Sequence, residues 1–304
     1  MRLVCSVILL ACACGNLSNE DVAFLEALPQ KGMVHVSVPA GSTAQNVCLI
    51  GPDDIWSFAK PAGDNINQGV DNILTLVDAI RAVPPTTRDS DQRTWGPFPD
   101  NNHAGADVQV TMFRELDANG VPWRWIYTIA ERRAPGAFLP ILEGEFFGAQ
   151  AKNGIGRLTV HFENTWTLGF NNPKDPNAPP NGPARYFYDL SGDPRTISLD
   201  LTAAVGLGLE RFDYGWAGYA DGHGRFDYAI PQANGCTLEV TAFFAASGAG
   251  RDVYRARCPL FTYGDIVLCR DASGCLTYLS DPFGIRLECH GVPCILGNPA
   301  SCAQ

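Results

Sequence analysis

Residues 106–131, ADVQVTMFRELDANGVPWRWIYTIAE, are the stretch that decides the fold. Apolar and polar residues alternate on both sides of the dipeptide Asn-Gly at 119–120. Asn-Gly between two alternating runs is the strongest short-range signal of a β-hairpin, because both residues tolerate the positive φ angles of a tight turn. A two-residue turn there predicts four cross-strand pairs, which place an apolar and aromatic row on one face: Leu116 with Trp123, Arg114 with Trp125, Met112 with Tyr127 and Val110 with Ile129.

The tetrapeptide Arg-Phe-Asp-Tyr occurs at 211–214 and again at 225–228, and it predicts a second hairpin. A three-residue loop at 220–222, with Gly222 in the left-handed region, joins the two copies in this prediction. The loop sets aromatic residues opposite one another in a ladder, which contains Trp216 with Phe226, Tyr214 with Tyr228 and Phe212 with Ile230. Further alternating runs predict strands at 139–147, 156–163, 184–190, 196–202, 236–245 and 250–258.

This succession of alternating runs predicts a mainly β fold, an antiparallel meander that curls into a half-barrel or closes into a barrel. Two short helices are expected before the meander. Ser18 caps the first helix, and the second carries apolar residues at helical spacing from Val70 to Ile80 before it stops at Pro84. A disulfide-rich segment is expected at the C-terminus.

Two further segments complete the predicted organisation: 34–38 is interpreted as a strand and 86–105 as a long polar loop. We expect a single domain at 12–304. It comprises an anchor and helical part at 12–104, the β-meander at 105–262 and a cysteine-rich tail at 263–304.

The chain of 304 residues is 46% hydrophobic and only 18% charged, which supplies enough apolar material for a packed core. It carries 22 Lys and Arg against 32 Asp and Glu, a formal net charge of −10. This acidic balance argues against sequence-independent binding to nucleic acid or to anionic lipid surfaces. No nucleic-acid partner is therefore expected.

The N-terminus has the features of an export signal. Arg2 precedes an apolar run that is too short to span a bilayer as a helix, and the run ends in LLACACG at 9–15. This ending resembles the lipobox of bacterial lipoproteins, with Cys12 in the position of the acylated cysteine and Cys14 as the alternative. The resemblance implies that 1–11 is a signal peptide and that acyl chains such as palmitate anchor the mature protein to a membrane. An ordinary cleaved signal, or a buried N-terminal strand, is the alternative interpretation.

The chain as a whole looks like predicted envelope lipoproteins of unknown function in Gram-negative bacteria. Ala13 or Gly15 follows the candidate cysteine, instead of the Asp that retains some lipoproteins in the inner membrane. The resemblance therefore implies a lipid-anchored protein of the cell envelope, at the outer membrane more than the inner one. It carries over no active residues.

Eight of the eleven cysteines lie beyond the lipobox, an even number in a chain that we expect to be exported. In an oxidising compartment the expected state is disulfides. The spacings Cys269-x5-Cys275 and Cys289-x4-Cys294 favour a structural zinc site less. The disulfide candidates are Cys48, Cys236, Cys258, Cys269, Cys275, Cys289, Cys294 and Cys302.

No catalytic constellation is evident in the sequence. The five histidines, His35, His103, His161, His223 and His290, share no metal-ligand spacing, so neither a metal nor a cofactor is predicted. Carboxylates on predicted strands are the positions where a glycosidase pair could lie, namely Glu143, Glu145, Asp189, Asp213 and Asp227.

The leading functional hypothesis is a membrane-tethered, non-enzymatic β protein. It would bind a hydrophobic ligand or an envelope protein on an aromatic sheet face made of Trp123, Trp125, Tyr127, Tyr214, Trp216, Phe226 and Tyr228. Complete coverage of that face by the helix at 70–83 would argue against the ligand. An envelope glycan hydrolase that uses paired carboxylates and a purely structural envelope protein are the alternatives.

Overall fold

The computed structural model describes residues 17–28, 34–37, 83–101, 103–148, 154–170, 181–205, 208–232 and 235–280, together with scattered positions between 63 and 81. The expected acylation sites Cys12 and Cys14 lie outside the described residues, as do Cys48, Cys289, Cys294 and Cys302.

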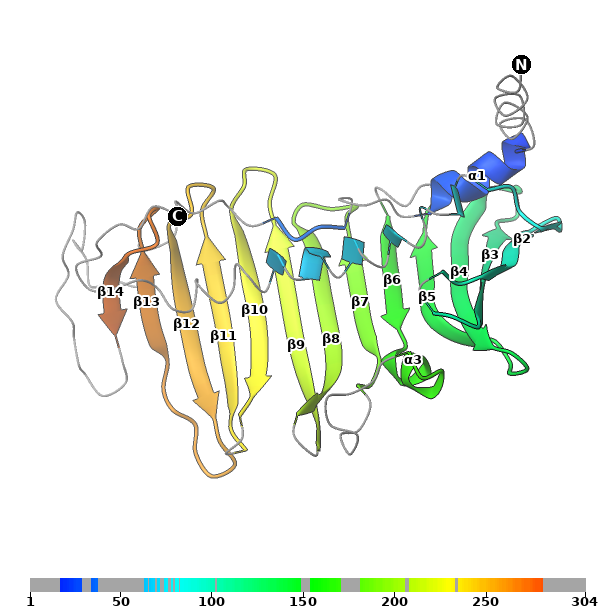
Figure 1. The fold of residues 1–304 in the computed structure, drawn as a ribbon. Coiled ribbons are helices and arrows are strands. Elements are labelled where there is room, and N and C mark those ends of the chain that lie inside the picture. The colour runs from blue at the N-terminus through cyan, green and yellow to red at the C-terminus, as the bar shows by residue number, and fades with distance from the viewer. Residues whose placement is uncertain are drawn as a thin grey trace, which may run out of the picture.

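Fourteen strands form one antiparallel sheet, in which each strand pairs with its neighbours in the sequence (Figure 1). The predicted mainly β meander is therefore confirmed. The sheet is not closed, because β1 and β14 are its two edges. Its strands are β1 (Thr87–Arg88), β2 (Gln92–Pro99), β3 (Ala106–Leu116), β4 (Pro122–Arg133), β5 (Leu139–Phe147), β6 (Ile155–Val160), β7 (Ala184–Asp189), β8 (Arg195–Val205), β9 (Gly208–Gly218), β10 (Gly224–Pro231), β11 (Thr237–Phe244), β12 (Gly250–Arg257), β13 (Ile266–Arg270) and β14 (Leu276–Ser280).

The two predicted hairpins have the expected registers over most of their length. The confirmed pairs are Arg114 with Trp125, Met112 with Tyr127, Val110 with Ile129, Trp216 with Phe226, and Tyr214 with Tyr228. The pairing of Leu116 with Trp123 is wrong, since Leu116 faces Pro122 across an irregularity in the ladder. The cause is Asp117, whose carboxylate accepts hydrogen bonds from the backbone N–H groups of Asn119 and Val121 and draws Val121 into a longer turn.

The structure differs from the predicted strands in three parts of the sheet. The expected loop at 86–105 contains two strands: β1 pairs with β2, and β2 pairs with β3. Trp95 on β2 is fully buried and donates a hydrogen bond from Nε1 to the carbonyl of Val83 at 2.9 Å. The expected strand at 156–163 ends at Val160 and is followed by a short helix, α3 (Phe162–Thr167). The sheet also continues beyond 262, as the hairpin of β13 and β14.

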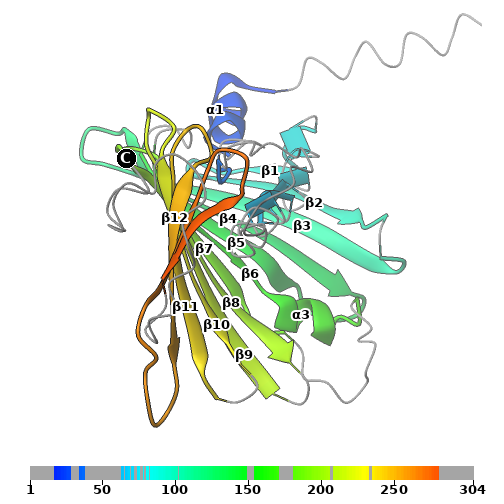
Figure 2. The same cartoon turned by 90° about the vertical axis from the view of Figure 1, so that its left-hand side faces the viewer.

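The N-terminal part covers one face of the sheet. Helix α1 (Asn19–Ala27) begins with the expected cap, in which the Ser18 side chain and the Asp21 side chain each accept the other residue's backbone N–H. The described positions between 63 and 81 are helical and lie in front of β6 to β9 (Figure 1), on the side toward which the sheet curls (Figure 2). Buried residues of both segments, including Phe24, Val70 and Leu74, belong to one core cluster with the inward-facing side chains of the strands.

Residues 35–37 are not a strand, which corrects the prediction for 34–38. The Asn67 side chain takes the place of a strand partner: its Oδ1 accepts from Val36 N at 2.7 Å, and its Nδ2 donates to Val36 O at 2.8 Å. The segment is attached to the sheet by side chains instead. Tyr186 on β7 donates its hydroxyl to Val34 O at 2.5 Å, and Trp216 on β9 donates Nε1 to Ser37 O at 3.0 Å.

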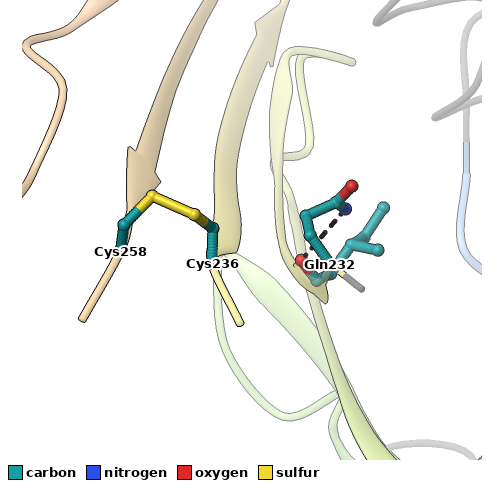
Figure 3. The surroundings of a disulfide bond; sticks show 4 residues. Gln232, Cys236 and Cys258 are labelled. Carbon is teal, nitrogen blue, oxygen red and sulfur yellow. Dashed lines mark hydrogen bonds between the residues drawn. A yellow bond between two sulfur atoms is a disulfide. The ribbon is translucent and has the colours of Figure 1, made fainter. Parts of the chain in front are cut away.

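A disulfide joins Cys236 and Cys258, just outside the paired ends of β11 and β12 (Figure 3). Their Cα atoms are 4.1 Å apart. Cys269 and Cys275, on the β13–β14 hairpin, each take part in a disulfide bond as well. The expectation of disulfides toward the C-terminus therefore holds for all four of the candidate cysteines that the structure describes.

Candidate functional site

Six of the seven aromatic residues predicted to bind a ligand lie in the core. Trp125, Tyr127, Tyr214, Trp216, Phe226 and Tyr228 each expose 9% or less of their surface, while Trp123 exposes 44%. Phe24 of α1 packs edge-on against Trp125 with ring centroids 5.2 Å apart. The six residues therefore belong to the core that the sheet shares with the N-terminal part and do not form an open aromatic surface.

Three polar atoms of this core have no hydrogen-bond partner within the described part of the chain: the hydroxyls of Tyr127 and Tyr214 and Nε1 of Trp125. An unpaired buried polar group costs about 1–3 kcal/mol. Burial raises the pKa of Tyr127 well above the usual value, and the neighbouring Tyr188 adds to the effect. Tyr127 and Tyr188 therefore stay neutral in the folded chain over the physiological pH range.

An accessible hollow lies where β8 begins and β9 ends, next to the loop at 219–223. Its volume is about 570 Å³, and its lining includes Asp193, Arg195, Trp216, Tyr219, His223 and Phe244. We call it the rim hollow. Trp216 is the one residue of the predicted aromatic set in this lining, and it contributes the apolar floor together with Phe244. Small-molecule sites typically have volumes of about 300–1,000 Å³, so the rim hollow is large enough for one.

The loop beside the rim hollow is ordered by local contacts. His223 stacks on Tyr219 with ring centroids 3.9 Å apart, and its Nδ1 contacts the Asp221 carboxylate. The backbone N–H of Ala220 donates to Asp193 Oδ1 at 3.1 Å. Arg195 is exposed and forms no ion pair with any residue that the structure describes. The rim of the hollow therefore presents one unpaired cation beside an apolar floor.

The five carboxylates considered as glycosidase candidates all have partners on the outer face or in turns. Glu145 binds Arg124 and Arg157, and Glu143 Oε2 lies 2.7 Å from His161 Nε2. The other three bind as follows: Asp189 accepts from Ser191, Asp213 pairs with Arg211, and Asp227 pairs with Arg225 and accepts from Thr241. A general acid needs a raised pKa, whereas hydrogen bonds from Ser191 lower the pKa of Asp189.

A separate cluster joins Asp100, His103 and Glu131, which the sequence did not indicate because the three residues follow no known ligand spacing. Their donor atoms all lie within 4.8 Å of one another. His103 Nδ1 is 2.5 Å from Asp100 Oδ2 and 3.4 Å from Glu131 Oε2. Burial raises the pKa of Glu131, the charge of Asp100 raises it further, and His103 opposes both effects.

These features define the class of protein: an open antiparallel meander whose concave face is covered by its own N-terminal part, with an accessible hollow at one rim. No protein-family model matches the chain, and neither curated proteins nor solved structures return a significant match. Among the described residues, no helix has both the length and the apolar character needed to cross a bilayer.

Proposed function

We propose that this protein is a non-enzymatic binding protein of the bacterial cell envelope, tethered by an acylated Cys12 and located at the outer membrane. Its ligand is a small amphipathic molecule with an apolar body and an anionic head. The observation that carries the ligand part is the rim hollow. The lipobox-like N-terminus supports the tether.

The size and lining of the rim hollow support an amphipathic ligand. Its floor consists of Trp216 and Phe244, both nearly fully buried and both part of the sheet core. Burial of apolar surface contributes about 25 cal/mol per Å², so an alkyl or aromatic ligand body in contact with this floor would supply most of the affinity. Ser37 of the N-terminal part also lines the rim hollow and accepts the Trp216 hydrogen bond, so a ligand there would contact both the sheet and the N-terminal part.

The charge at the rim supports an anionic head. Arg195 is exposed and unpaired among the described residues, while the nearby Asp193 carboxylate already accepts a backbone hydrogen bond. A guanidinium binds carboxylate and phosphate oxygens through two parallel hydrogen bonds, which adds orientation as well as energy. Arg195 is therefore the residue that we expect to select anionic over neutral ligands.

The test uses the full chain purified from the envelope of an oxidising bacterial host. Native mass spectrometry with solvent extraction identifies bound molecules, and palmitic acid and hexadecanol serve as matched anionic and neutral probes. We expect Arg195→Gln to weaken palmitate binding about tenfold and to leave hexadecanol binding unchanged, since a charge-assisted hydrogen bond contributes about 1.5–3 kcal/mol. Arg211→Gln, which removes an exposed arginine of the outer face, is the matched control.

Equal palmitate affinity in the wild type and in Arg195→Gln would contradict the assignment of the head group. A chain that carries only the acyl mass and binds neither probe would favour a structural or partner-binding role. The tether has its own test: Cys12→Ser should abolish the acyl mass, and an acyl mass that persists in Cys12→Ser and disappears in Cys14→Ser would move the site to Cys14.

A further inference from the structure

We propose that Asp100, His103 and Glu131 form a binding site for one divalent transition-metal ion, with Zn²⁺ as the representative ion. This inference is independent of the rim hollow and of the membrane tether. Two of the residues lie between β2 and β3, and Glu131 lies on β4. The adjacency of β3 and β4 in the sheet brings them together.

The donor set matches the chemistry of such an ion. One imidazole nitrogen and two carboxylate oxygens are available, and all three donor atoms lie within 4.8 Å of one another. Imidazole together with carboxylate is typical of Zn²⁺ and its neighbours, whereas Ca²⁺ and Mg²⁺ prefer oxygen alone. Metal–ligand bonds of about 2.0–2.2 Å place tetrahedral ligands about 3.3 Å apart. The 3.4 Å between His103 Nδ1 and Glu131 Oε2 already fits this geometry.

The environment of Glu131 is a second observation, besides the grouping of the three residues, that points to a bound cation. Its surface is only 3% exposed, and its Oε2 atom, which faces His103, accepts no hydrogen bond from any described residue. A buried carboxylate oxygen without a hydrogen bond is costly unless a cation balances it. The second carboxylate, Asp100, lies on the same imidazole nitrogen at 2.5 Å, so negative charge converges on one point.

The arginines that follow Glu131 do not neutralise it. Arg133 donates Nε to Leu168 O at 2.6 Å and Nη1 to Ala104 O at 3.3 Å. Arg132 pairs with Asp107. Both guanidinium groups thus bind other partners.

The surroundings hold the imidazole in the orientation that a metal ion requires. Phe170 stacks on the His103 ring with centroids 3.9 Å apart and an interplanar angle of 11°. Arg133 lies over the other aromatic ring of this stack, 5.1 Å from the Phe170 centroid. Backbone hydrogen bonds from Asp100 N to Ala106 O and from Ala106 N to His103 O order the connecting loop. The three ligands therefore lie close together before an ion binds, and Asp100 Oδ2 has to move from 2.5 Å to about 3.3 Å from His103 Nδ1 when both bind the same ion.

The experiment uses the full, oxidised chain after chelator treatment and alkylation of any free thiol, so that cysteines cannot contribute ligands. Calorimetric titration with Zn²⁺ measures affinity, and the visible spectrum of the Co²⁺ complex reports nitrogen and oxygen coordination of low symmetry. We expect saturable binding of one ion per chain and a rise in Tm with Zn²⁺. Glu131→Gln and His103→Asn should each lower the affinity at least about tenfold and remove the Co²⁺ bands.

Glu143→Gln is the matched control. Glu143 also contacts a histidine that has a second carboxylate neighbour, but His161 binds Glu143 through Nε2 and Glu163 through Nδ1, so these carboxylates do not converge on one nitrogen. This variant should bind Zn²⁺ like the wild type. The Tm of each metal-free variant shows whether it is folded.

Three results would overturn the proposal. The first is the absence of saturable Zn²⁺ binding by the folded wild type, which would make the cluster a His–carboxylate ion pair. The second is Zn²⁺ affinity that Glu131→Gln and His103→Asn leave unchanged. The third is a preference for Ca²⁺ over Zn²⁺, which would exclude the imidazole as a ligand.

Discussion

The ring of Tyr127 on β4 occupies the space beside Gly144 on β5 that a side chain would need. A Cβ atom at Gly144 would lie 1.9 Å from Tyr127 Cζ. Tyr127 and Gly144 are cross-strand partners. Tyr188 on β7 is likewise the cross-strand partner of Gly156 on β6, and its ring occupies the space beside that glycine. Glycine at these positions lets large rings of the concave face lie against the neighbouring strand, where a side chain would displace them.

Gly144→Ala should therefore destabilise the protein by about 1–3 kcal/mol, the usual cost of overpacking a core. The measurement is the free energy of unfolding in denaturant, with far-UV circular dichroism to confirm that the fold persists. Gly215→Ala is the matched control, since a Cβ atom there would meet its nearest neighbour, Asp227 Cβ, at an ordinary 3.7 Å. Equal stability of the two variants would contradict the role of the ring.

The buried ion pair of Asp21 and Arg93 attaches α1 to β2. Asp21 Oδ1 is 2.7 Å from Arg93 Nε, and both side chains are almost fully buried. Arg93 also lies over the Phe24 ring, 4.6 Å from its centroid. Asp21→Asn should lower the free energy of unfolding by about 1.5–3 kcal/mol at neutral pH, because the buried guanidinium loses a charge-assisted hydrogen bond and keeps only the exposed carboxylate of Glu20 as its counter-charge.

The ion pair of Asp21 and Arg93 should also contribute to the loss of folding stability in acid. Burial raises the pKa of Asp21, but hydrogen bonds from Ser18, Arg93 and Arg88 lower it more, so the net pKa is well below the usual value of 3.8. Since the folded chain binds this proton more weakly, the stabilisation is complete above pH 4 or so and is lost as pH falls below it. Unfolding measured between neutral pH and acid should show a smaller decrease in Asp21→Asn. An unchanged decrease would assign the acid sensitivity to other carboxylates, and Glu26→Gln, at an exposed position of α1, is the control.

Tyrosine ionisation should report on the integrity of the core. Burial raises the pKa values of Tyr127, Tyr186, Tyr188 and Tyr214 above the usual value of 10.0. The folded chain holds these protons more tightly, so the free energy of unfolding is unaffected below about pH 10 and falls as pH rises further.

The tyrosinate absorbance should accordingly rise in two stages, with the exposed tyrosines first and the four tyrosines of raised pKa together with unfolding. Tyr127→Phe should reduce the second stage, while Tyr219→Phe, at a residue with 38% exposure, should reduce the first. Loss of the unpaired Tyr127 hydroxyl should cost little stability. A single transition near pH 10 would show that the concave face admits water.

Much of the sheet was predictable from local pattern. The alternation on both sides of Asn119-Gly120 predicted β3 and β4 and three of their pairs, and the turn at 220–222 with a left-handed Gly222 is present at the tip of β9 and β10. The sequence at 92–99 predicts a loop, because nothing in it shows that α1 brings Asp21 to neutralise Arg93. The side-chain hydrogen bond between Arg93 and Asp21 joins residues 72 positions apart in the chain.

The sequence by itself determined the mainly β class, the meander connectivity and the aromatic rows on one face of the sheet, because alternation and turn chemistry act between neighbouring residues. Only the tertiary structure decided that the N-terminal part covers those rows, that Trp216 and Arg195 meet at a rim hollow, and that Glu131 is buried beside Asp100 and His103. These relations join residues far apart in the chain, and they depend on how the curled sheet and the N-terminal part pack, which no local period encodes.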